Sequence, residues 1–378
     1  MCYNKCVTLT FLTMNPGIFK AYDIRGIYPD DINEDDAYNI GWAVVAHLAP
    51  KRLGIGRDIR QSSPSLFKSF TQGVMDAGCD VLDLGIITTP MVYFAAGRLD
   101  IDAAISLTAS HNPPQYNGMK IVLRGAIPVG ENSGLQEIRD LALRGERKDA
   151  ERKGAMTTED ICPAYFGFFT SFADFQDKHF TIAIDTANAM GVLELPIYEQ
   201  FPDNLSIVNL YNDMEHAFEC HEANPLKTET LAELQEKVKE SEADLGIAYD
   251  GDADRVGFVD EQGMVIPMDL VTALLAKTIL KRRSGVTILY HTTFPFLHKI
   301  IEENGGIATE CPIASPQMKK QMHEENAVFG SSGTGGYYFE ENSFAEAPTL
   351  AAIFLLNTMA TADLPISKLV EVVHPSNT

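Results

Sequence analysis

Residues 53–60 read Leu-Gly-Ile-Gly-Arg-Asp-Ile-Arg, a short apolar run that gives way to a polar loop. The Ser-Pro pair at residues 63–64 favours a helix start there, with serine as the cap and proline in the first turn. Apolar residues recur at helical spacing through 67–77, Gly78 ends the helix, and residues 81–84 fit the next strand. Alternation of this kind predicts an α/β domain with a mixed or mainly parallel sheet.

The same strand-then-loop opening recurs twice further along the chain. Residues 181–188 read Thr-Ile-Ala-Ile-Asp-Thr-Ala-Asn, and residues 287–293 read Thr-Ile-Leu-Tyr-His-Thr-Thr. The three openings lie a domain's length apart. We therefore expect three consecutive similar α/β domains, with mixed sheets sandwiched by helices and an active site in the cleft between them.

Composition suggests where these domains begin and end. Residues 144–155 are charged and lack core residues, and residues 260–264 form a turn between apolar runs. We expect a first domain at 14–150, a second at 151–259 and a third at 260–378. Residues 1–13 are expected to be a disordered extension, and translation could begin at Met1 or at Met14.

The chain is strongly acidic, which limits its partners. Of its 378 residues, 52 are Asp or Glu and 30 are Lys or Arg, giving a net charge of −22. Nucleic acid and anionic lipid are repelled, so neither is an expected partner, and a phosphate-bearing substrate must meet a local basic pocket or a metal. No apolar run approaches the roughly 18 residues that span a bilayer. The six cysteines show no Cys-x-x-Cys spacing, so we expect a reducing, cytoplasmic location.

Residues 250–255 read Asp-Gly-Asp-Ala-Asp-Arg and predict a site for a hard divalent cation. The helix at 230–240, with a possible capping box from Thr230 to Glu233, leads into a strand at 244–249 that delivers Asp250 to its carboxyl end. An EF-hand is excluded because arginine occupies the sixth loop position and a strand precedes the loop. A solvated acidic turn is the plainer alternative.

Residues 106–120 read Ser-Leu-Thr-Ala-Ser-His-Asn-Pro-Pro-Gln-Tyr-Asn-Gly-Met-Lys, and they place Ser110, His111 and Lys120 on one short excursion after a strand at 103–107. These polar residues could simply cap the loop. Ser110 and His111 are not expected to form a hydrolase dyad, because neighbouring side chains usually point apart. A hydroxyl that can carry phosphate, beside a magnesium-type site, predicts phosphoryl transfer.

At these motifs the chain resembles the α-D-phosphohexomutases, the phosphomannomutase and phosphoglucomutase group. The resemblance covers about residues 17–370 in the family's order. The matching stretches are 19–26 (Phe-Lys-Ala-Tyr-Asp-Ile-Arg-Gly), 56–60 (Gly-Arg-Asp-Ile-Arg), 108–113 (Thr-Ala-Ser-His-Asn-Pro) with 117–120 (Asn-Gly-Met-Lys), 221–225 (His-Glu-Ala-Asn-Pro) and 250–255.

The resemblance implies a reaction in two transfers, which exchanges hexose 1-phosphate and hexose 6-phosphate of mannose or glucose through a bisphosphorylated sugar. Ser110 would carry the phosphoryl group, with Mg²⁺ between its phosphate and the aspartates of the acidic loop, and a hexose 1,6-bisphosphate would act as activator. The other roles implied are proton transfer for His111 and Lys120, support of the phosphoserine pocket for Arg25 and Arg60, metal binding for Asp250, Asp252 and Asp254, and substrate contact for Arg255.

Two departures from the family pattern qualify the expected activity. The family's sugar-reading loop is Gly-Glu-x-Ser-Gly-His, whereas here Ser332 replaces the glutamate, Thr334 the serine and Gly336 the histidine. Lys319 keeps a family lysine upstream, so we expect Ser332, Thr334 and Lys319 to bind substrate. The family's fourth, C-terminal domain, which clamps the non-transferring phosphate, is expected to be absent.

We therefore expect weak mutase activity. Two alternatives stay open. One is a catalytically impaired relic or regulatory phosphoprotein. The other is one half of a split mutase, completed by a separate C-terminal-domain polypeptide.

Overall fold

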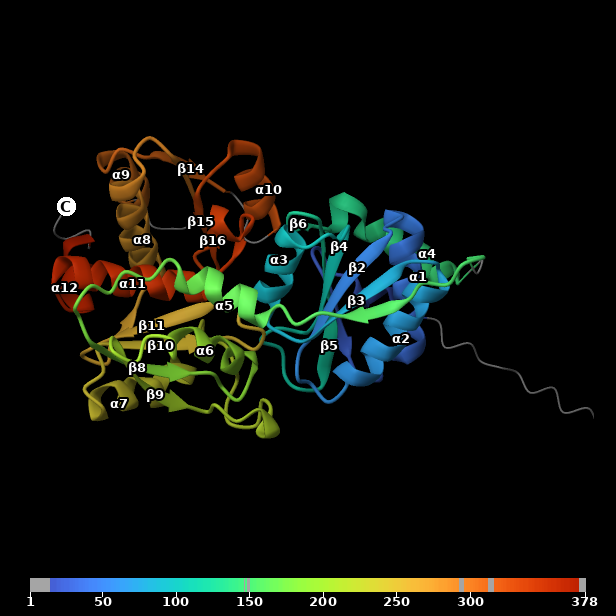
Figure 1. Cartoon of the computed structure of the whole chain (residues 1–378), viewed down its shortest axis with the longest axis horizontal. Coiled ribbons are helices and arrows are strands. Elements are labelled where there is room, and N and C mark those ends of the chain that lie inside the picture. Colours follow the sequence, from blue (N-terminus) through green and yellow to red (C-terminus); the bar gives the residue numbers. More distant parts are fainter. Residues whose placement is uncertain (1–13, 146, 148–149, 292–295, 312–315, 374–378) are drawn as a thin grey trace, which may run out of the picture.

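The structure, a computed structural model, describes residues 14–145, 147, 150–291, 296–311 and 316–373. The extension expected at residues 1–13 lies outside these ranges. Figure 1 shows the amino-terminal domain as one lobe and the two later domains together as the other. Three α/β domains with mixed sheets confirm the predicted fold class.

The first domain is built on a seven-stranded sheet with the order β1-β5-β4-β2-β3-β7, and β6 pairs with β5. Its strands are β1 (Ile24–Ile27), β2 (Arg52–Arg57), β3 (Asp80–Ile86), β4 (Ala103–Leu107), β5 (Tyr116–Leu123), β6 (Ile127–Pro128) and β7 (Met156–Thr158). Its helices are α1 (Glu34–Leu48), α2 (Ser63–Asp76), α3 (Thr89–Arg98) and α4 (Gln136–Arg144).

The second domain has a five-stranded sheet with the order β12-β11-β10-β8-β9. Its strands are β8 (Phe180–Asp185), β9 (Leu205–Leu210), β10 (Leu245–Tyr249), β11 (Val256–Asp260) and β12 (Val265–Ile266). Its helices are α5 (Cys162–Thr170), α6 (Leu195–Tyr198) and α7 (Ala232–Glu240), together with 3-10 turns that include Met190–Glu194 and Thr228–Leu231.

The third domain has a five-stranded sheet with the order β14-β13-β15-β16-β17. Its strands are β13 (Thr287–Tyr290), β14 (Ile307–Glu310), β15 (Phe329–Ser331), β16 (Tyr337–Phe339) and β17 (Ala345–Glu346). Its helices are α8 (Met268–Arg282), α9 (Phe296–Glu303), α10 (Pro316–Glu325), α11 (Pro348–Ala362) and α12 (Ile366–Val373).

The three sheets share one plan. In each, a central strand has a parallel strand on one side, followed by a second parallel strand. On its other side the central strand pairs with the antiparallel strand that follows it in the chain: β4 with β5, β10 with β11, and β15 with β16. The openings recognised in the sequence are β2, β8 and β13, which hold the same place in their sheets. The three connections after β4, β10 and β15 are therefore equivalent, and they carry residues 108–115, 250–255 and 332–336.

One apolar core links the domains. It runs from α3 through α5 and β8 to α11, where Val92, Tyr165, Ile182 and Phe354 belong to a single cluster of buried side chains. Helix α11 is buried along most of its length. Among the described helices, none alone combines the length and apolarity needed to cross a bilayer; α11 and α12 reach them only as a pair bent by 93°.

The helix starts differ in detail from the sequence-based expectation. Helix α2 is capped at Ser62 without a side-chain bond, whereas Ser63 is already helical and donates to Asp58 Oδ1. The capping box expected at Thr230 does not form. A 3-10 turn precedes α7, and the Thr230 hydroxyl donates to the carbonyl oxygens of Asn224 and Lys227 instead.

Two strands extend beyond the expected domain boundaries. β7 begins after residue 150 and pairs with β3 of the first sheet, while β12 begins after residue 259 and pairs with β11 of the second. Sheet membership alone does not define a domain, so the boundaries stay a prediction.

Candidate active site

The serine loop of the first domain contacts the acidic loop of the second. The Ser110 hydroxyl donates a hydrogen bond to Asp250 Oδ2 over 2.9 Å. Gly251 permits this approach, because a Cβ atom there would lie 2.2 Å from the Ser110 carbonyl oxygen. The two most informative motifs of the sequence, 140 positions apart, therefore form one site.

Asp250, Asp252 and Asp254 converge as a triad with the geometry to hold a metal ion. One carboxylate oxygen from each lies within 4.8 Å of the others, and all three residues are buried. Within the described part of the chain, Asp252 Oδ1 and Asp254 Oδ1 are buried without a hydrogen-bond partner. Buried oxygens of this kind need a cation or a donor, and three carboxylates suit a hard divalent ion. Burial, and then the charges of Asp254 and Asp252, raise the pKa of Asp250 well above its ordinary value.

Lys120 reaches the same triad from strand β5. Antiparallel pairing sets it opposite Ser106 on β4, the strand that leads to the serine loop. Its ammonium lies 2.6 Å from Asp252 and 2.5 Å from Asp254. Burial opposes its charge, but the two carboxylates prevail and raise the pKa of Lys120. The lysine is therefore charged at the point where the two loops meet.

Ser110 and His111 do come together, contrary to the expectation that neighbours point apart. His111 Nδ1 lies 3.3 Å from Ser110 Oγ. Ser110 has a φ of 51°, in the left-handed region, so the usual divergence of consecutive side chains does not apply. Burial, assisted by Arg255 and Arg25, lowers the pKa of His111 to about 4, so its ring is neutral at pH 7.

Arg60 organises the serine loop from beneath. Its guanidinium is buried, pairs with Asp58 at 3.0 Å and donates to the carbonyl oxygens of Ser110 and Asn112 over 2.7 and 2.8 Å. The Phe218 ring lies 4.5 Å from its guanidinium carbon. Arg60 therefore spends its hydrogen bonds on Asp58 and on the backbone of the serine loop, and so it fixes the conformation of that loop.

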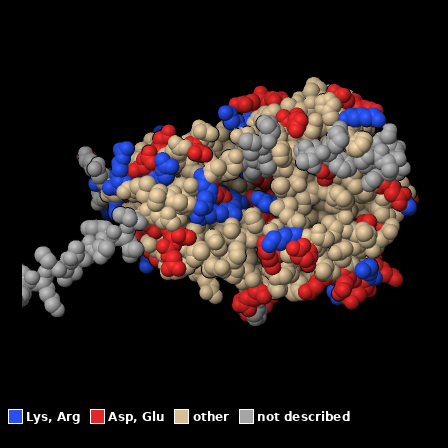
Figure 2. Space-filling view, turned by 180° about the vertical axis from the view of Figure 1, so that it is seen from behind, with Lys and Arg blue, Asp and Glu red and all other residues tan. Residues whose placement is uncertain are grey.

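Arg25 lies closer to solvent than Arg60. Strand β1 carries it, and its guanidinium donates to the Ala109 carbonyl oxygen over 3.2 Å while pairing with Asp23. It lines a cavity of about 140 Å³ that also receives Lys120, Arg255 and Lys319. Figure 2 shows basic side chains gathered beside a hollow in the middle of an otherwise mixed surface.

Lys319 enters this cavity from α10 of the third domain. Its ammonium lies 2.6 Å from Glu346 Oε2 and 3.6 Å from the centre of the Tyr93 ring. Burial lowers the pKa of Lys319, and the Glu346 carboxylate opposes that shift.

Ser332 and Thr334 lie on the β15–β16 hairpin, and neither is among the described residues that line the cavity. Their hydroxyls bond to each other over 2.8 Å, and the Ser332 hydroxyl also donates to the Gly336 carbonyl oxygen. The hairpin meets the acidic loop through its backbone, where Val256 N donates to Gly335 O over 3.0 Å.

Sequence reasoning missed three residues of this region. The Thr89 hydroxyl donates to Asp252 Oδ2 over 2.6 Å, although Thr-Thr-Pro in the sequence is typical of a plain helix start. Tyr93 and Glu346 line the cavity from α3 and β17. Helical spacing from Thr89 to Tyr93 could have suggested that one face of α3 points at the site.

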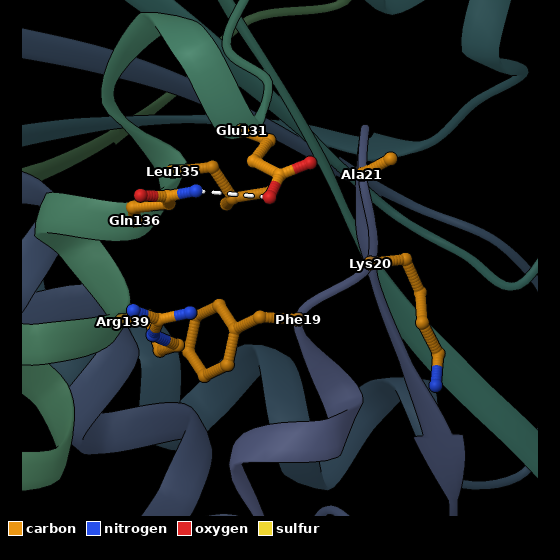
Figure 3. Close-up of a pocket in the computed structure, with 7 residues that line it drawn as sticks. All are labelled: Phe19, Lys20, Ala21, Glu131, Leu135, Gln136 and Arg139. Carbon is orange, nitrogen blue, oxygen red and sulfur yellow. Dashed lines mark hydrogen bonds between the residues drawn. The ribbon is translucent and has the colours of Figure 1, made fainter.

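A second, smaller cavity of about 90 Å³ lies in the first domain, away from the acidic triad. Figure 3 shows the Phe19 ring beside Arg139 on one side and the Gln136–Glu131 hydrogen bond on the other, with Lys20 pointing away. None of the predicted site residues lines it.

Comparison with known proteins agrees with this geometry. Family models described as phosphoglucomutase/phosphomannomutase α/β/α domains I, II and III match residues 16–149, 163–263 and 267–375. A phosphomannomutase of Methanocaldococcus jannaschii is 35% identical, over 93% of this chain and 78% of its own length. A phosphomannomutase/phosphoglucomutase of Pseudomonas aeruginosa is 35% identical, over 88% of this chain and 71% of its own.

A solved structure of a phosphoglucomutase/phosphomannomutase family protein from Burkholderia thailandensis shares the fold. It superposes with a TM-score of 0.87 at 28% identity, covering 94% of this chain and 79% of its own. With three consecutive domain models and relatives above 30% identity, the chain belongs to the phosphoglucomutase/phosphomannomutase family, the α-D-phosphohexomutases, which are intramolecular phosphotransferases.

Proposed function

We propose that this chain interconverts hexose 1-phosphate and hexose 6-phosphate, of mannose, glucose or both, with Ser110 as the phosphorylated residue. The observation that carries the proposal is the 2.9 Å contact between the Ser110 hydroxyl and Asp250 of the acidic triad. Phosphoryl transfer needs mainly positioning and neutralisation of charge, and both are available where these loops meet.

Asp250, Asp252 and Asp254 are the proposed ligands of Mg²⁺, with an oxygen on Ser110 completing the protein's contribution. The unpartnered buried oxygens of Asp252 and Asp254 support a cation here. When bound, Mg²⁺ would supply positive charge beside the transferring phosphate.

The remaining residues act on protons and on the second phosphate. In the first transfer a sugar hydroxyl gives up its proton and attacks the phosphorus on Ser110, the bond from phosphorus to the serine oxygen breaks, and that oxygen gains a proton. In the second transfer the Ser110 hydroxyl gives up its proton and attacks the other phosphate of the bisphosphate, the bond from that phosphorus to the sugar oxygen breaks, and the sugar oxygen gains a proton. His111, neutral and 3.3 Å from Ser110 Oγ, and Lys120 are proposed to handle these protons. Arg25, Arg255 and Lys319 line the cavity and are proposed to bind the substrate's anionic groups.

A hexose 1,6-bisphosphate is proposed to keep Ser110 phosphorylated between turnovers. The bisphosphate formed in the first transfer must turn around so that its other phosphate faces Ser110. Two basic side chains of the cavity, Arg25 and Lys120, come from β1 and β5, and two, Arg255 and Lys319, come from the later domains, which supports binding of a phosphate from either side.

We propose weak turnover for this chain. Ser332 and Thr334 satisfy each other's hydroxyls and carry no charge, whereas charged groups make the stronger hydrogen bonds to sugar hydroxyls. The free thiols of Cys79, Cys162 and Cys220 support the proposed reducing, cytoplasmic setting.

Two measurements test the function. Intact-mass analysis should find one labelled phosphate on Ser110 after incubation with isotopically labelled glucose 1,6-bisphosphate and Mg²⁺ and removal of the free bisphosphate, and adding unlabelled hexose 1-phosphate should move that label to the sugar. A coupled assay should then show conversion of mannose 1-phosphate or glucose 1-phosphate to the 6-phosphate. Label that stays on Ser110 in the presence of substrate would support the regulatory phosphoprotein instead.

Restoration of turnover by a separately supplied fourth domain would identify the split mutase. The coupled mutase assay is therefore run with and without a polypeptide that carries the family's fourth domain, at matched Mg²⁺ and bisphosphate concentrations.

A further inference from the structure

A buried carboxyl lies where all three domains meet. Glu194 ends a 3-10 turn of the second domain and has no exposed surface. It accepts hydrogen bonds from Thr88 of the first domain over 2.8 Å and from Thr349 of the third over 2.6 Å. Tyr165 of α5 adds a third donor at 3.2 Å. One side chain thus bonds directly to three separate elements of the core.

The first arm of this junction leads to the acidic triad. Thr88 caps helix α3 by accepting from Met91 N. The next residue, Thr89, donates its hydroxyl to Asp252 Oδ2 over 2.6 Å and its backbone N–H to the Asp252 carbonyl oxygen over 3.1 Å. Because Thr88 and Thr89 are consecutive residues, a shift of Thr88 would displace Thr89 and, through its two hydrogen bonds, Asp252.

The second arm leads to the start of the same loop. The Thr349 hydroxyl donates its hydrogen to Glu194, so it accepts a hydrogen bond from the Tyr249 hydroxyl over 2.8 Å. The Tyr249 hydroxyl in turn accepts a hydrogen bond from the Tyr198 hydroxyl over 2.6 Å. Tyr249 is the last residue of β10 and is bonded covalently to Asp250. The two chains of hydrogen bonds that start at Glu194 therefore reach the acidic loop at Asp250 and at Asp252.

A carboxyl at this point is costly to bury. Burial raises the pKa of Glu194, and the three hydroxyl donors oppose that rise. Apolar side chains of similar volume would often fill such a junction with equal or better stability. Apolar side chains would not, however, fix one relative placement of the three domains. A hydrogen-bond network does so, because all its donors and acceptors are satisfied in only one arrangement.

We propose that Glu194 is a positioning residue that fixes the register of the three domains, so that the acidic loop stays aligned with Ser110 through both phosphoryl transfers. The proposal rests on the proposed function for its reference to transfer. It concerns atoms remote from the substrate, because neither Glu194 nor its three donors lines the cavity among the described residues.

The test compares loss of an interdomain bond with loss of an equally buried bond inside one domain. Thr88→Val and Thr349→Val remove the two bonds that cross domain boundaries, and each keeps the shape of the side chain. Tyr165→Phe removes the third bond to the same carboxyl and is the matched control. Glu194→Gln keeps the volume and one acceptor. Each variant is compared with the wild type in melting temperature, Mg²⁺ affinity by calorimetry, and kcat and KM.

Thr88→Val, Thr349→Val and Glu194→Gln are expected to lower kcat about tenfold or more, with KM changed far less, because small misplacement of reacting groups is expensive. Mg²⁺ affinity should fall with kcat, and amide exchange at residues 249–254 should speed up. Tyr165→Phe should lower the melting temperature to a similar extent while kcat and Mg²⁺ affinity stay within about twofold of the wild type.

The proposal fails if Tyr165→Phe and the two threonine variants change kcat and Mg²⁺ affinity equally, or if none changes them. Should the wild type itself lack mutase turnover, the proposed function fails instead. Mg²⁺ affinity and amide exchange would then still decide the role of Glu194.

Discussion

The hairpins at residues 250–255 and 332–336 hold the same position in two sheets of one plan, yet they carry opposite chemistry. The first buries three carboxylates within 4.8 Å of each other, and the second buries or half-buries neutral hydroxyls and glycines. They lie side by side, since Val256 N, directly after the first loop, donates a hydrogen bond to the Gly335 carbonyl oxygen of the second. The contrast teaches that the fold fixes where a loop lies, whereas its side chains decide what it can do.

The two hairpins also differ in how their polar atoms are satisfied. Asp252 and Asp254 each keep a buried oxygen without a hydrogen-bond partner in the described structure, which leaves capacity for a ligand. Ser332 and Thr334 use their capacity on one another. The loop at residues 250–255 therefore has oxygen atoms available for a cation, whereas the hydroxyls of the loop at residues 332–336 are already hydrogen-bonded to each other.

The largest effect is expected from Asp250→Asn, which removes one negative charge from the acidic hairpin while preserving its shape. We expect kcat to fall about a hundredfold to a thousandfold, comparable to loss of a key electrostatic contact in other enzymes. The coupled mutase assay measures kcat, and calorimetry with Mg²⁺ should show weaker binding in parallel.

The control is Asp260→Asn, at the end of β11, where the carboxylate caps a turn by accepting from Gln262 N and Met264 N. This variant should lose stability and keep its kcat. Equal losses of kcat in both variants would mean that the acidic hairpin has no special role.

A second large effect is expected from Gly251→Ala. The new Cβ would lie 2.2 Å from the Ser110 carbonyl oxygen, so the serine and acidic loops must separate. Misplacement on the scale of an ångström costs about a hundredfold in rate. Gly167→Ala is the matched control, since a Cβ there meets nothing within 4 Å. Retained kcat in Gly251→Ala would show that the contact is not needed.

The sequence revealed the strands that bear the site better than the contacts that complete it. Strand β4 (Ala103–Leu107) and strand β13 (Thr287–Tyr290) match the residues expected from apolar runs. Period and turn chemistry act over a few residues, so they can be recognised in a short window. The acidic triad was equally visible because its three members alternate along the chain.

What escaped prediction depends on contacts between distant segments. Thr89 reaches Asp252 across 163 positions, and Glu194 reaches Thr349 across 155. The closeness of Ser110 and His111 follows from a single positive φ, which a serine rarely adopts and no local pattern announces. These features belong to the packing of domains, which a single sequence does not encode in any short window.

A moderate gain is expected when the neutral hairpin is given charge. Ser332→Glu places a carboxylate where the family pattern has glutamate, and a charged hydrogen bond exceeds a neutral one by about 1–1.5 kcal/mol. That difference should raise kcat/KM for hexose phosphates about tenfold. Ser332→Gln adds the same length without charge and should leave kcat/KM near the parent value. An equal kcat/KM in the two variants would show that this hairpin does not recognise the sugar.

The smallest effect is expected from Thr334→Val. The Thr334 hydroxyl bonds to Ser332 over 2.8 Å and lines no part of the cavity within the described structure, so its loss should affect the hairpin rather than the substrate. We expect urea unfolding to report a loss of about 1 kcal/mol, the value of one neutral hydrogen bond. We expect kcat/KM to change less than about threefold, because no charged contact is removed. A tenfold fall in kcat/KM with unchanged stability would instead mean that Thr334 turns toward the sugar during turnover, and the neutral hairpin would then share in recognition despite lacking charge.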